Sequence, residues 1–222
     1  MRLSFTSTLL LAIGTAFPAF AADKDYGSAS GAAVICEMNL ARQSPAVYAT
    51  FLQELRSRMN GNVLVLPGKT RLRTKEGTAA IDDAIRFLQN AQPLPPLTVS
   101  RGMNQAAADH CADQAAGGFG HEGKDRSRGG QRIARYGTAR GSWGENISYG
   151  KSTARDVVLA LIIDDGLPAR KHRANIFNPN FNFAGAAFGP HARFGTMCSM
   201  DFAGGYIERG ETPVNTLVAK NF

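Results

Sequence analysis

Two imidazoles and two carboxylates in the second half of the chain could together support acid–base or metal chemistry. They are His121, Glu145, Asp164 and His172. Neutral imidazoles bind Zn²⁺ and similar divalent ions, and nearby carboxylates orient the imidazoles or hold metal-bound water. Glu145 is the candidate general base on such a water. The residue types therefore indicate a divalent-metal site made by these four side chains.

The spacing of these residues does not by itself make a site. The four are irregularly spaced, and the chain has no His-Glu-x-x-His motif. Ser142 and Ser148 flank Glu145, but neither has a base evident in the sequence, so no nucleophile is identified. Any joint chemistry depends on a fold that brings the four side chains together.

Hydrophobic periodicity and capping residues predict the helices that position them. Apolar residues recur at helical spacing in five segments, three of which begin at a Ser or Thr cap and one at Ser44-Pro45. The expected helices cover about 33–42, 45–55, 79–88, 101–114 and 154–163.

The remaining segments predict strands and loops. Val63–Leu66 is a candidate short strand, and residues 181–202 suggest an antiparallel hairpin that turns at Gly189-Pro190. His191, at that turn, is expected to face solvent, with the cleft as the alternative. The Gly-rich segment 117–150 is interpreted as a loop with one short helix near 131–136. Helices early and strands late favour the α+β class.

The first 22 residues have the pattern of a signal peptide. Arg2 precedes an apolar run from Leu9 to Phe20, and Ala19-Phe20-Ala21 offers small residues at a cleavage site. The run of about twelve residues is too short to span a membrane, which needs roughly 20. The sequence predicts a mature chain that starts near Ala22, has no transmembrane segment and is secreted, either to the periplasm or outside the cell.

The three cysteines are too few for a disulfide scaffold. In an oxidising compartment Cys111–Cys198 or Cys36–Cys198 could pair, and three buried free thiols are the alternative. The sequence does not choose between these arrangements.

The basic balance comes from 25 Lys and Arg against 18 Asp and Glu. One cluster lies at alternate positions in 69–75, and a second crowds the Gly-rich segment. A solvated face is the favoured interpretation, and attraction to lipid head groups, cell-wall polymers or an acidic partner is the alternative. Nucleic acid is not expected, because an exported chain without aromatic stacking residues beside its arginines does not suit it. The clusters consist of Lys69, Arg71, Arg73 and Lys75, and of Arg126, Arg128, Arg132, Arg135 and Arg140.

A series of motifs resembles the CAP superfamily, the cysteine-rich secretory, antigen 5 and pathogenesis-related group, and its bacterial secreted branch (SCP domain) most closely. The similarity covers roughly Ala33–Arg56 and Pro95–Tyr206. Its most specific parts are the Gly-Glu-Asn-Ile box at 144–147 and the His-Arg-Ala-Asn-Ile box at 172–176. A helix that ends in Cys and Gly before a loop His, a Val-Val helix and a Phe-Gly-Thr-Met-Cys strand complete the pattern.

The resemblance implies an α-β-α sandwich, with a central antiparallel sheet between helical layers and a cleft lined by two His and two acidic residues. The family's motif positions fall on His121, Glu145 and His172. Its second acid falls on Asp164, where Glu is usual, with Asp165 as a near competitor. The expected organisation is a signal peptide at 1–22, a flexible lead-in at 23–32, the CAP domain at 33–206 with an insertion at about 57–92, and a tail at 207–222.

Three functions fit this sequence. The favoured one is a secreted binding module whose cleft holds a divalent ion and whose surface recognises a lipid or sterol, a cell-wall glycan or a protein. The first alternative is a metal-assisted, peptidase-like hydrolase that uses His121, His172 and Glu145. The second is a non-catalytic structural protein in which the four residues only hold loops. The insertion could cover the cleft or form a separate binding edge.

Overall fold

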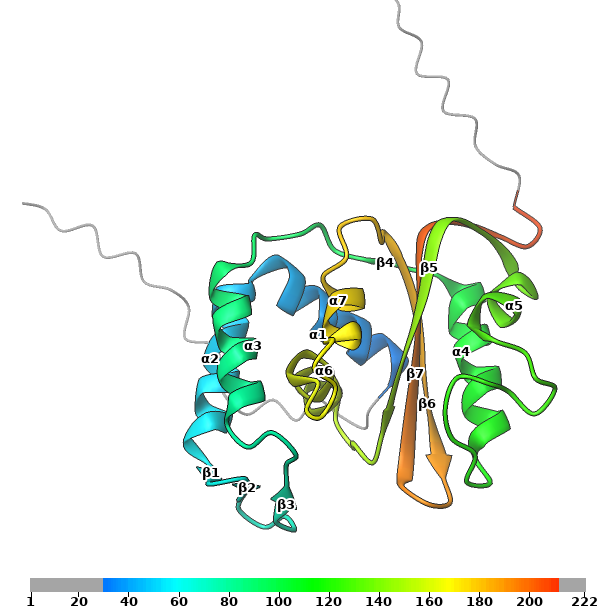
Figure 1. Ribbon diagram of the computed structural model, residues 1–222. Helices are drawn as coiled ribbons and strands as arrows, with labels where there is room; N and C mark the ends of the chain where they lie inside the picture. Colours follow the sequence, from blue (N-terminus) through cyan, green and yellow to red (C-terminus); the bar gives the residue numbers. More distant parts are fainter. Residues whose placement is uncertain (1–29, 212–222) are drawn as a thin grey trace, which may run out of the picture.

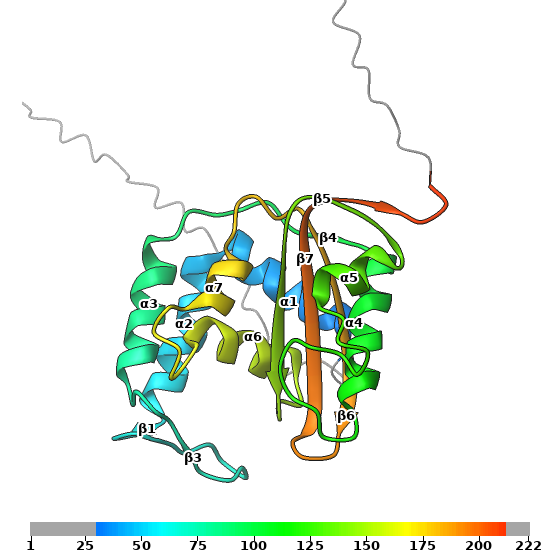
Figure 2. The same ribbon diagram turned by 45° about the vertical axis from the view of Figure 1, so that its right-hand side comes forward.

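The computed structural model describes residues 30–211, and the expected signal peptide lies outside the described residues. A central sheet is packed between two layers of helices, as Figures 1 and 2 show from two directions. This arrangement is the α-β-α sandwich that the sequence predicted. Within residues 30–211 no helix is both long and apolar enough to cross a membrane.

The central sheet has the order β4-β6-β7-β5, so β5 is an edge strand. β5 and β6 both pair antiparallel with β7, and only the short β4 pairs parallel, with β6. A second, small antiparallel sheet has the order β1-β2-β3. The strands are β1 Met59–Asn60, β2 Val63–Leu64, β3 Leu72–Arg73, β4 Thr98–Val99, β5 Gly137–Tyr149, β6 Phe183–His191 and β7 Gly195–Glu208.

α1, α6 and α7 pack against one face of the central sheet, with α2 and α3 on their outer side, and α4 and α5 pack against the other face (Figure 1). α1, α2, α3, α6 and α7 enclose the larger core, into which β7 directs Cys198, Met200 and Phe202. α4 and α5 enclose the smaller cores on the opposite face. The helices are α1 Gly31–Gln43, α2 Pro45–Ser57, α3 Ala79–Asn90, α4 Arg101–Gln114, α5 Gly129–Ala134, α6 Ala154–Ile163 and α7 Lys171–Ile176.

Local capping explains where the two long helices near the site begin. The Ser100 hydroxyl accepts a hydrogen bond from Met103 N, and the Thr153 hydroxyl accepts one from Asp156 N. Ser44 and Thr78 occupy N-cap positions without a side-chain cap bond. All five expected helices are present, and α1 begins at Gly31, inside the segment expected as a lead-in.

Two strand predictions were wrong. The Gly-rich segment is not a continuous loop, since Gly137–Tyr149 forms β5 and pairs along its length with β7. The hairpin turns at 192–194 rather than at Gly189-Pro190, which lie inside β6. In both cases the hydrogen-bonded ladder with β7 overrides a weak local strand propensity. A local sequence pattern does not contain this long-range pairing.

The insertion at 57–92 folds as the small sheet followed by α3, and it lies beside α6 (Figure 2). Ile81, Ala84 and Leu88 of α3 are buried in the larger core. The insertion is therefore an integral part of the helical layer and not a separate domain.

Candidate functional site

The first imidazole–carboxylate pair joins a loop to the edge strand. His121 lies in the loop between α4 and α5, and its Nδ1 is 2.7 Å from Oε1 of Glu145 on β5. The His121 side chain is 57% exposed, whereas the Glu145 side chain is buried. The other carboxylate oxygen, Oε2, accepts a hydrogen bond from Nη2 of Arg132 on α5. Both oxygens of Glu145 are thus bonded.

Arg132 anchors the loop that carries His121. Its side chain is fully buried, and the guanidinium donates to the carbonyl oxygens of His121, at 3.2 and 3.3 Å, and of Ser127, at 2.6 Å. Burial is the largest single influence on Glu145 and raises its pKa. The hydrogen bond from His121 and the charge of Arg132 outweigh it, so the pKa of Glu145 is lowered overall. Glu145 is therefore held as a carboxylate.

The second pair is built from the ends of two helices. α6 ends at Asp164, whose backbone is left-handed with φ of 56°. Its carboxylate accepts one hydrogen bond from Nδ1 of His172, at 2.6 Å, and another from the His172 backbone N–H, at 3.0 Å. The Asp164 side chain is buried and that of His172 is 21% exposed. Asp164 stands where the family pattern usually has Glu, and its shorter side chain still reaches the imidazole of His172.

Two asparagines connect the pairs. Asn146, next to Glu145, donates through Nδ2 to the carbonyl oxygen of His172, at 3.0 Å. Asn175 donates through Nδ2 to Oδ1 of Asn146, at 2.8 Å, and to the Glu145 carbonyl, at 3.4 Å. The two most specific sequence boxes are thus bonded to each other, and this fixes α7 against β5.

Both imidazoles have the same tautomer if they are neutral. A carboxylate only accepts hydrogen bonds, so Nδ1 carries the proton in His121 and in His172, and each Nε2 keeps a lone pair. Within residues 30–211 no group of three or more His, Cys, Asp or Glu side chains is placed to hold a metal. The arrangement offers two imidazole nitrogens, with the carboxylates behind them.

Asp165 bonds the insertion and makes no hydrogen bond to either imidazole. Its carboxylate accepts hydrogen bonds from the backbone N–H groups of Lys75 and Glu76, both at 2.8 Å. Glu76 in turn makes a two-point contact with Arg170, with both distances 2.7 Å, and accepts from Gly166 N at 2.6 Å. The hydrogen bonds from Arg170 are the largest influence on Glu76 and lower its pKa to about 2. These contacts fasten the insertion to the α6–α7 connection.

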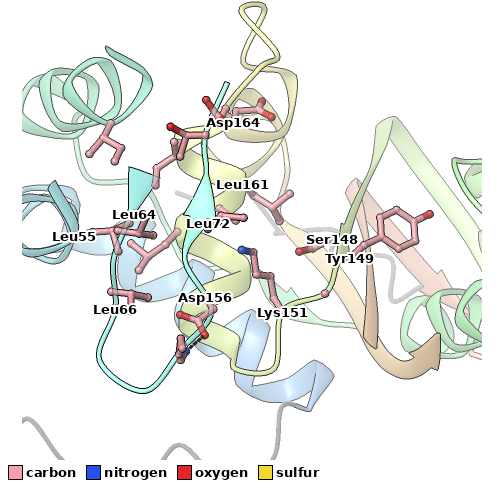
Figure 3. Close-up of a pocket in the computed structure, with 18 of the residues that line it drawn as sticks. Leu55, Leu64, Leu66, Leu72, Ser148, Tyr149, Lys151, Asp156, Leu161 and Asp164 are labelled. Carbon is pink, nitrogen blue, oxygen red and sulfur yellow. Dashed lines mark hydrogen bonds and ion pairs between the residues drawn. The ribbon is translucent and has the colours of Figure 1, made fainter. Parts of the chain in front are cut away.

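A pocket of about 790 Å³ lies between the insertion, α6 and the end of β5 (Figure 3). It includes Asp164 and His172 at one end and Lys151 and Asp156 at the other. Leucines from both sides line its walls, so the insertion covers a pocket along α6. The lining includes Asp164 and His172 but not His121 or Glu145, so this pocket is not the four-residue cleft that the family resemblance implies. The lining leucines are Leu55, Leu64, Leu66, Leu72, Leu159 and Leu161.

Other buried titratable groups lie on the α4 side of the sheet. Asp201 of β7 is the cross-strand neighbour of Glu145, and neither of its carboxylate oxygens has a hydrogen-bond partner among the described residues. Burial raises the pKa of Asp201 well above the usual carboxyl range, and the charge of Glu145 adds to the shift. Burial lowers the pKa of His110, whose Nε2 donates a hydrogen bond to Gly120 O at 3.0 Å. Asp201 is therefore expected to be a neutral acid.

His191 is not solvent-exposed, which corrects the expectation for a turn residue. It is buried, with Nε2 at 2.7 Å from the Gly118 carbonyl oxygen, and its Nδ1 accepts from the backbone N–H groups of Arg193 and Phe194. Both ring nitrogens are therefore used within the fold, and His191 ties the hairpin to the loop before His121.

All three cysteines are free. Cys111 packs with the α4-side core and Cys198 with the α1-side core, so the sheet separates them. Cys36 is exposed on α1. Neither of the two possible disulfides is present, and the alternative of three buried free thiols holds only for Cys111 and Cys198.

Sequence reasoning missed Arg132, Asn146 and Asn175 as residues that shape the site. Arg132 was grouped with a solvated basic cluster, although its neighbour Ile133 is a sign of a buried helix face. Arg135 of the same cluster bonds Asp109 at 2.9 Å and Asp125 at 2.5 Å. Part of this cluster is therefore a structural ion-pair network.

One family model and several solved structures are similar to this chain. The CAP family model, for the cysteine-rich secretory protein family, matches residues 54–202, which is more than half of the chain. One similar structure is an extracellular protein containing an SCP domain from Bacillus anthracis str. Ames, at 20% identity and TM-score 0.40, covering 50% of this chain and 34% of that one. Another is a cysteine-rich secretory protein from Staphylococcus aureus subsp. aureus Mu50, at 14% identity and TM-score 0.38, covering 62% and 42%.

This chain spans less than half the length of either of those chains. No curated protein matches it closely. The extent of the family-model match nevertheless decides the family, and this chain belongs to CAP, the cysteine-rich secretory protein family.

Proposed function

We propose that this chain is an exported binding module whose His/acid cleft holds a divalent cation such as Zn²⁺. Its surface recognises an extracellular ligand, for which a lipid or sterol, a cell-wall glycan and a protein are the candidate classes. The observation that carries the proposal is that each imidazole turns Nδ1 toward a buried carboxylate and keeps Nε2 for another partner. Carboxylates that orient ligand imidazoles in this way are typical of metal sites.

The donor set fits a loosely held divalent ion. His121 and His172 would supply two Nε2 ligands, with Glu145 and Asp164 behind them. Two protein ligands leave more positions open than the three-ligand sites of zinc enzymes, so we expect weaker binding than at those sites. When bound, such an ion polarises an oxygen of whatever ligand enters the cleft.

The geometry favours binding over hydrolysis. A general base needs an oxygen that is free to accept a proton from water. Both oxygens of Glu145 are bonded, one to His121 and one to Arg132, and its pKa is lowered. Glu145 is therefore a weak base as it stands, and the hydrolase is the second candidate.

Titration calorimetry on the chain beginning at Ala22 tests the metal site. Zn²⁺ and Mg²⁺ are titrated into the wild type and into the His121→Ala/His172→Ala double variant. The proposal expects saturable binding of at least one ion that is lost in the double variant. Equal heats in both proteins would remove the metal site.

Glu145→Gln separates the binding module from the hydrolase. If the chain is a binding module, Glu145→Gln keeps its metal affinity within a few fold of the wild type. Neither the wild type nor the variant then cleaves peptide or ester substrates. If the wild type cleaves such substrates and Glu145→Gln does so at least 100-fold more slowly while retaining metal, the hydrolase is the function.

A further inference from the structure

The free edge of β5 offers backbone hydrogen-bonding groups beside the pocket. Gly150 N donates to Thr196 O, at 2.9 Å, so the even-numbered residues at this end of β5 bond β7. In an antiparallel ladder the alternate residues direct their N–H and C=O groups the other way. Ile147 and Tyr149 therefore point these groups away from β7, and nothing in residues 30–211 hydrogen-bonds to them.

These two residues line the pocket with their backbone and not with their side chains. Ile147 and Tyr149 pack with Cys111 on the α4 side of the sheet. Figure 3 shows the Tyr149 ring turned away from the pocket, whereas Ser148 points toward Leu161. An incoming chain at this edge therefore meets amide and carbonyl groups first and the leucines of the opposite wall second.

The pocket also contains a cation without a partner. Figure 3 shows the Lys151 ammonium directed into the pocket, and among the described residues it has no ion pair within 4.0 Å. The neighbouring Lys69 is neutralised by Asp156 at 3.1 Å. The other end of the pocket is acidic, with Asp164 beside His172. The charge therefore favours an anionic group at the Lys151 end alone.

We propose that this pocket binds the carboxyl-terminal end of an extended peptide. The peptide adds as a strand to the edge of β5 at Ile147 and Tyr149, places apolar side chains among the leucines, and sets its terminal carboxylate against Lys151. A strand that begins beside His172 and ends at Lys151 runs in the same direction as β5. A fatty acid would satisfy Lys151 and the leucines but would leave the edge amides unpaired, so the observations favour the peptide.

This inference deepens the proposed function by naming the partner class, and it rests on that function only in treating the chain as a binding module. The metal pair is not needed for the peptide contacts at Lys151. Metal binding that survives while peptide binding is absent would overturn this inference alone. Absent metal binding with intact peptide binding would overturn only the metal part of the proposed function.

A peptide array tests the inference with the full mature chain. The probes are pentapeptides randomised at their last three positions, tethered through the amino end, with either a free carboxylate or an amide at the carboxyl end. We expect retention of the wild type on a subset with apolar last residues, at least tenfold above the matched amides. Lys151→Met and Lys151→Gln lose this preference, while Lys124→Met, at an exposed lysine outside the pocket, keeps it.

N-methylation of the best probe distinguishes strand addition from capture of a tail. Methyl groups on one set of alternate amides should weaken binding at least tenfold, and on the other set less than threefold, because only one set faces β5. Equal effects from both sets, or displacement by dodecanoate as effective as by the peptide itself, would replace the peptide with a fatty acid. Failure of every free-carboxylate probe to retain the wild type, or retention on amides equal to that on free acids, would overturn the inference.

Discussion

The two imidazole–carboxylate pairs contain the same groups but are held by different means. Glu145 lies on a strand and is fixed from behind by the buried guanidinium of Arg132. Among the described residues no guanidinium bonds the Asp164 carboxylate. The left-handed turn after α6, the backbone N–H of His172 and a hydrogen bond of 2.8 Å from Arg170 Nη1 to the Asp164 carbonyl oxygen hold Asp164 in place. His121 is 57% exposed on a loop, whereas His172 is 21% exposed on a helix.

This difference separates a rigid half of the site from an adjustable one. The half made by Asp164 and His172, here called the α7 half, is fixed because both residues lie at helix ends. The position of the His172 imidazole therefore follows from backbone geometry. In the other half the carboxylate is fixed, whereas the His121 side chain is 57% exposed on a loop that Arg132 and His191 hold only through its backbone carbonyls. We expect His121 to move on ligand binding more than His172.

Among the variants that test this difference, Arg132→Met should lower the free energy of unfolding the most. It leaves Glu145 buried with an uncompensated charge and removes three bonds to the His121 and Ser127 carbonyls, at a cost of about 3–5 kcal/mol in the free energy of unfolding. Urea denaturation measures this loss. The matched control is Arg101→Met on the exposed start of α4, with a change within about 0.5 kcal/mol. Similar values for the two variants would mean that Arg132 does not anchor the loop.

Asp164→Ala should rank second, with a loss of about 2–4 kcal/mol. It removes a charged acceptor of two hydrogen bonds, and it places Ala in a left-handed conformation that Asp and Asn tolerate better. Asp164→Asn keeps the backbone preference and part of the hydrogen bonding, so it should lose less than half as much. If Asn and Ala lose the same amount, the left-handed turn contributes nothing to the α7 half.

Asp201→Asn tests the buried acid that is the cross-strand neighbour of Glu145. No such buried acid neighbours Asp164 in the α7 half among the described residues. The pKa of Asp201 is raised in the folded chain, so its contribution to stability is present below the unfolded pKa and is lost as the pH rises through the folded one. The amide cannot ionise, so Asp201→Asn should be more stable than wild type at pH 8, by about 1–3 kcal/mol. Thermal melts at pH 5 and pH 8 measure the difference. A wild type that gains stability over the variant between these pH values would show an ionised, stabilised Asp201.

His121→Ala should have the smallest effect on stability, below about 1 kcal/mol, because its side chain is largely exposed. His172→Ala should cost more, since it leaves the buried Asp164 carboxylate with one donor fewer. Denaturation midpoints of the two single variants decide the order. A larger loss for His121 would reverse the assignment of the rigid and adjustable halves.

Much of the helical framework was predictable because its signals are local. Ser100 and Thr153 cap α4 and α6 through bonds only three residues away, and the apolar stripe of α3 is visible in the insertion. The resemblance of the two boxes identified the four candidate site residues, which the structure arranges as two pairs, His121 with Glu145 and His172 with Asp164. β5 was not predictable, since its Gly- and Ser-rich sequence becomes a strand only through its ladder with β7.

The sequence by itself determined the family, the starts of α4 and α6 and the four candidate site residues, because short-range motifs and caps encode them. It did not predict α7 or the way in which the four residues pair. Only the tertiary structure decided that Arg132 is a buried anchor and not a solvated charge, that His191 is enclosed, and that Cys111 and Cys198 lie on opposite faces of the sheet. Burial depends on residues far apart in the chain, such as β5 against β7 and the insertion against α6. No local pattern contains those contacts, and they create the pocket and the free edge beside it.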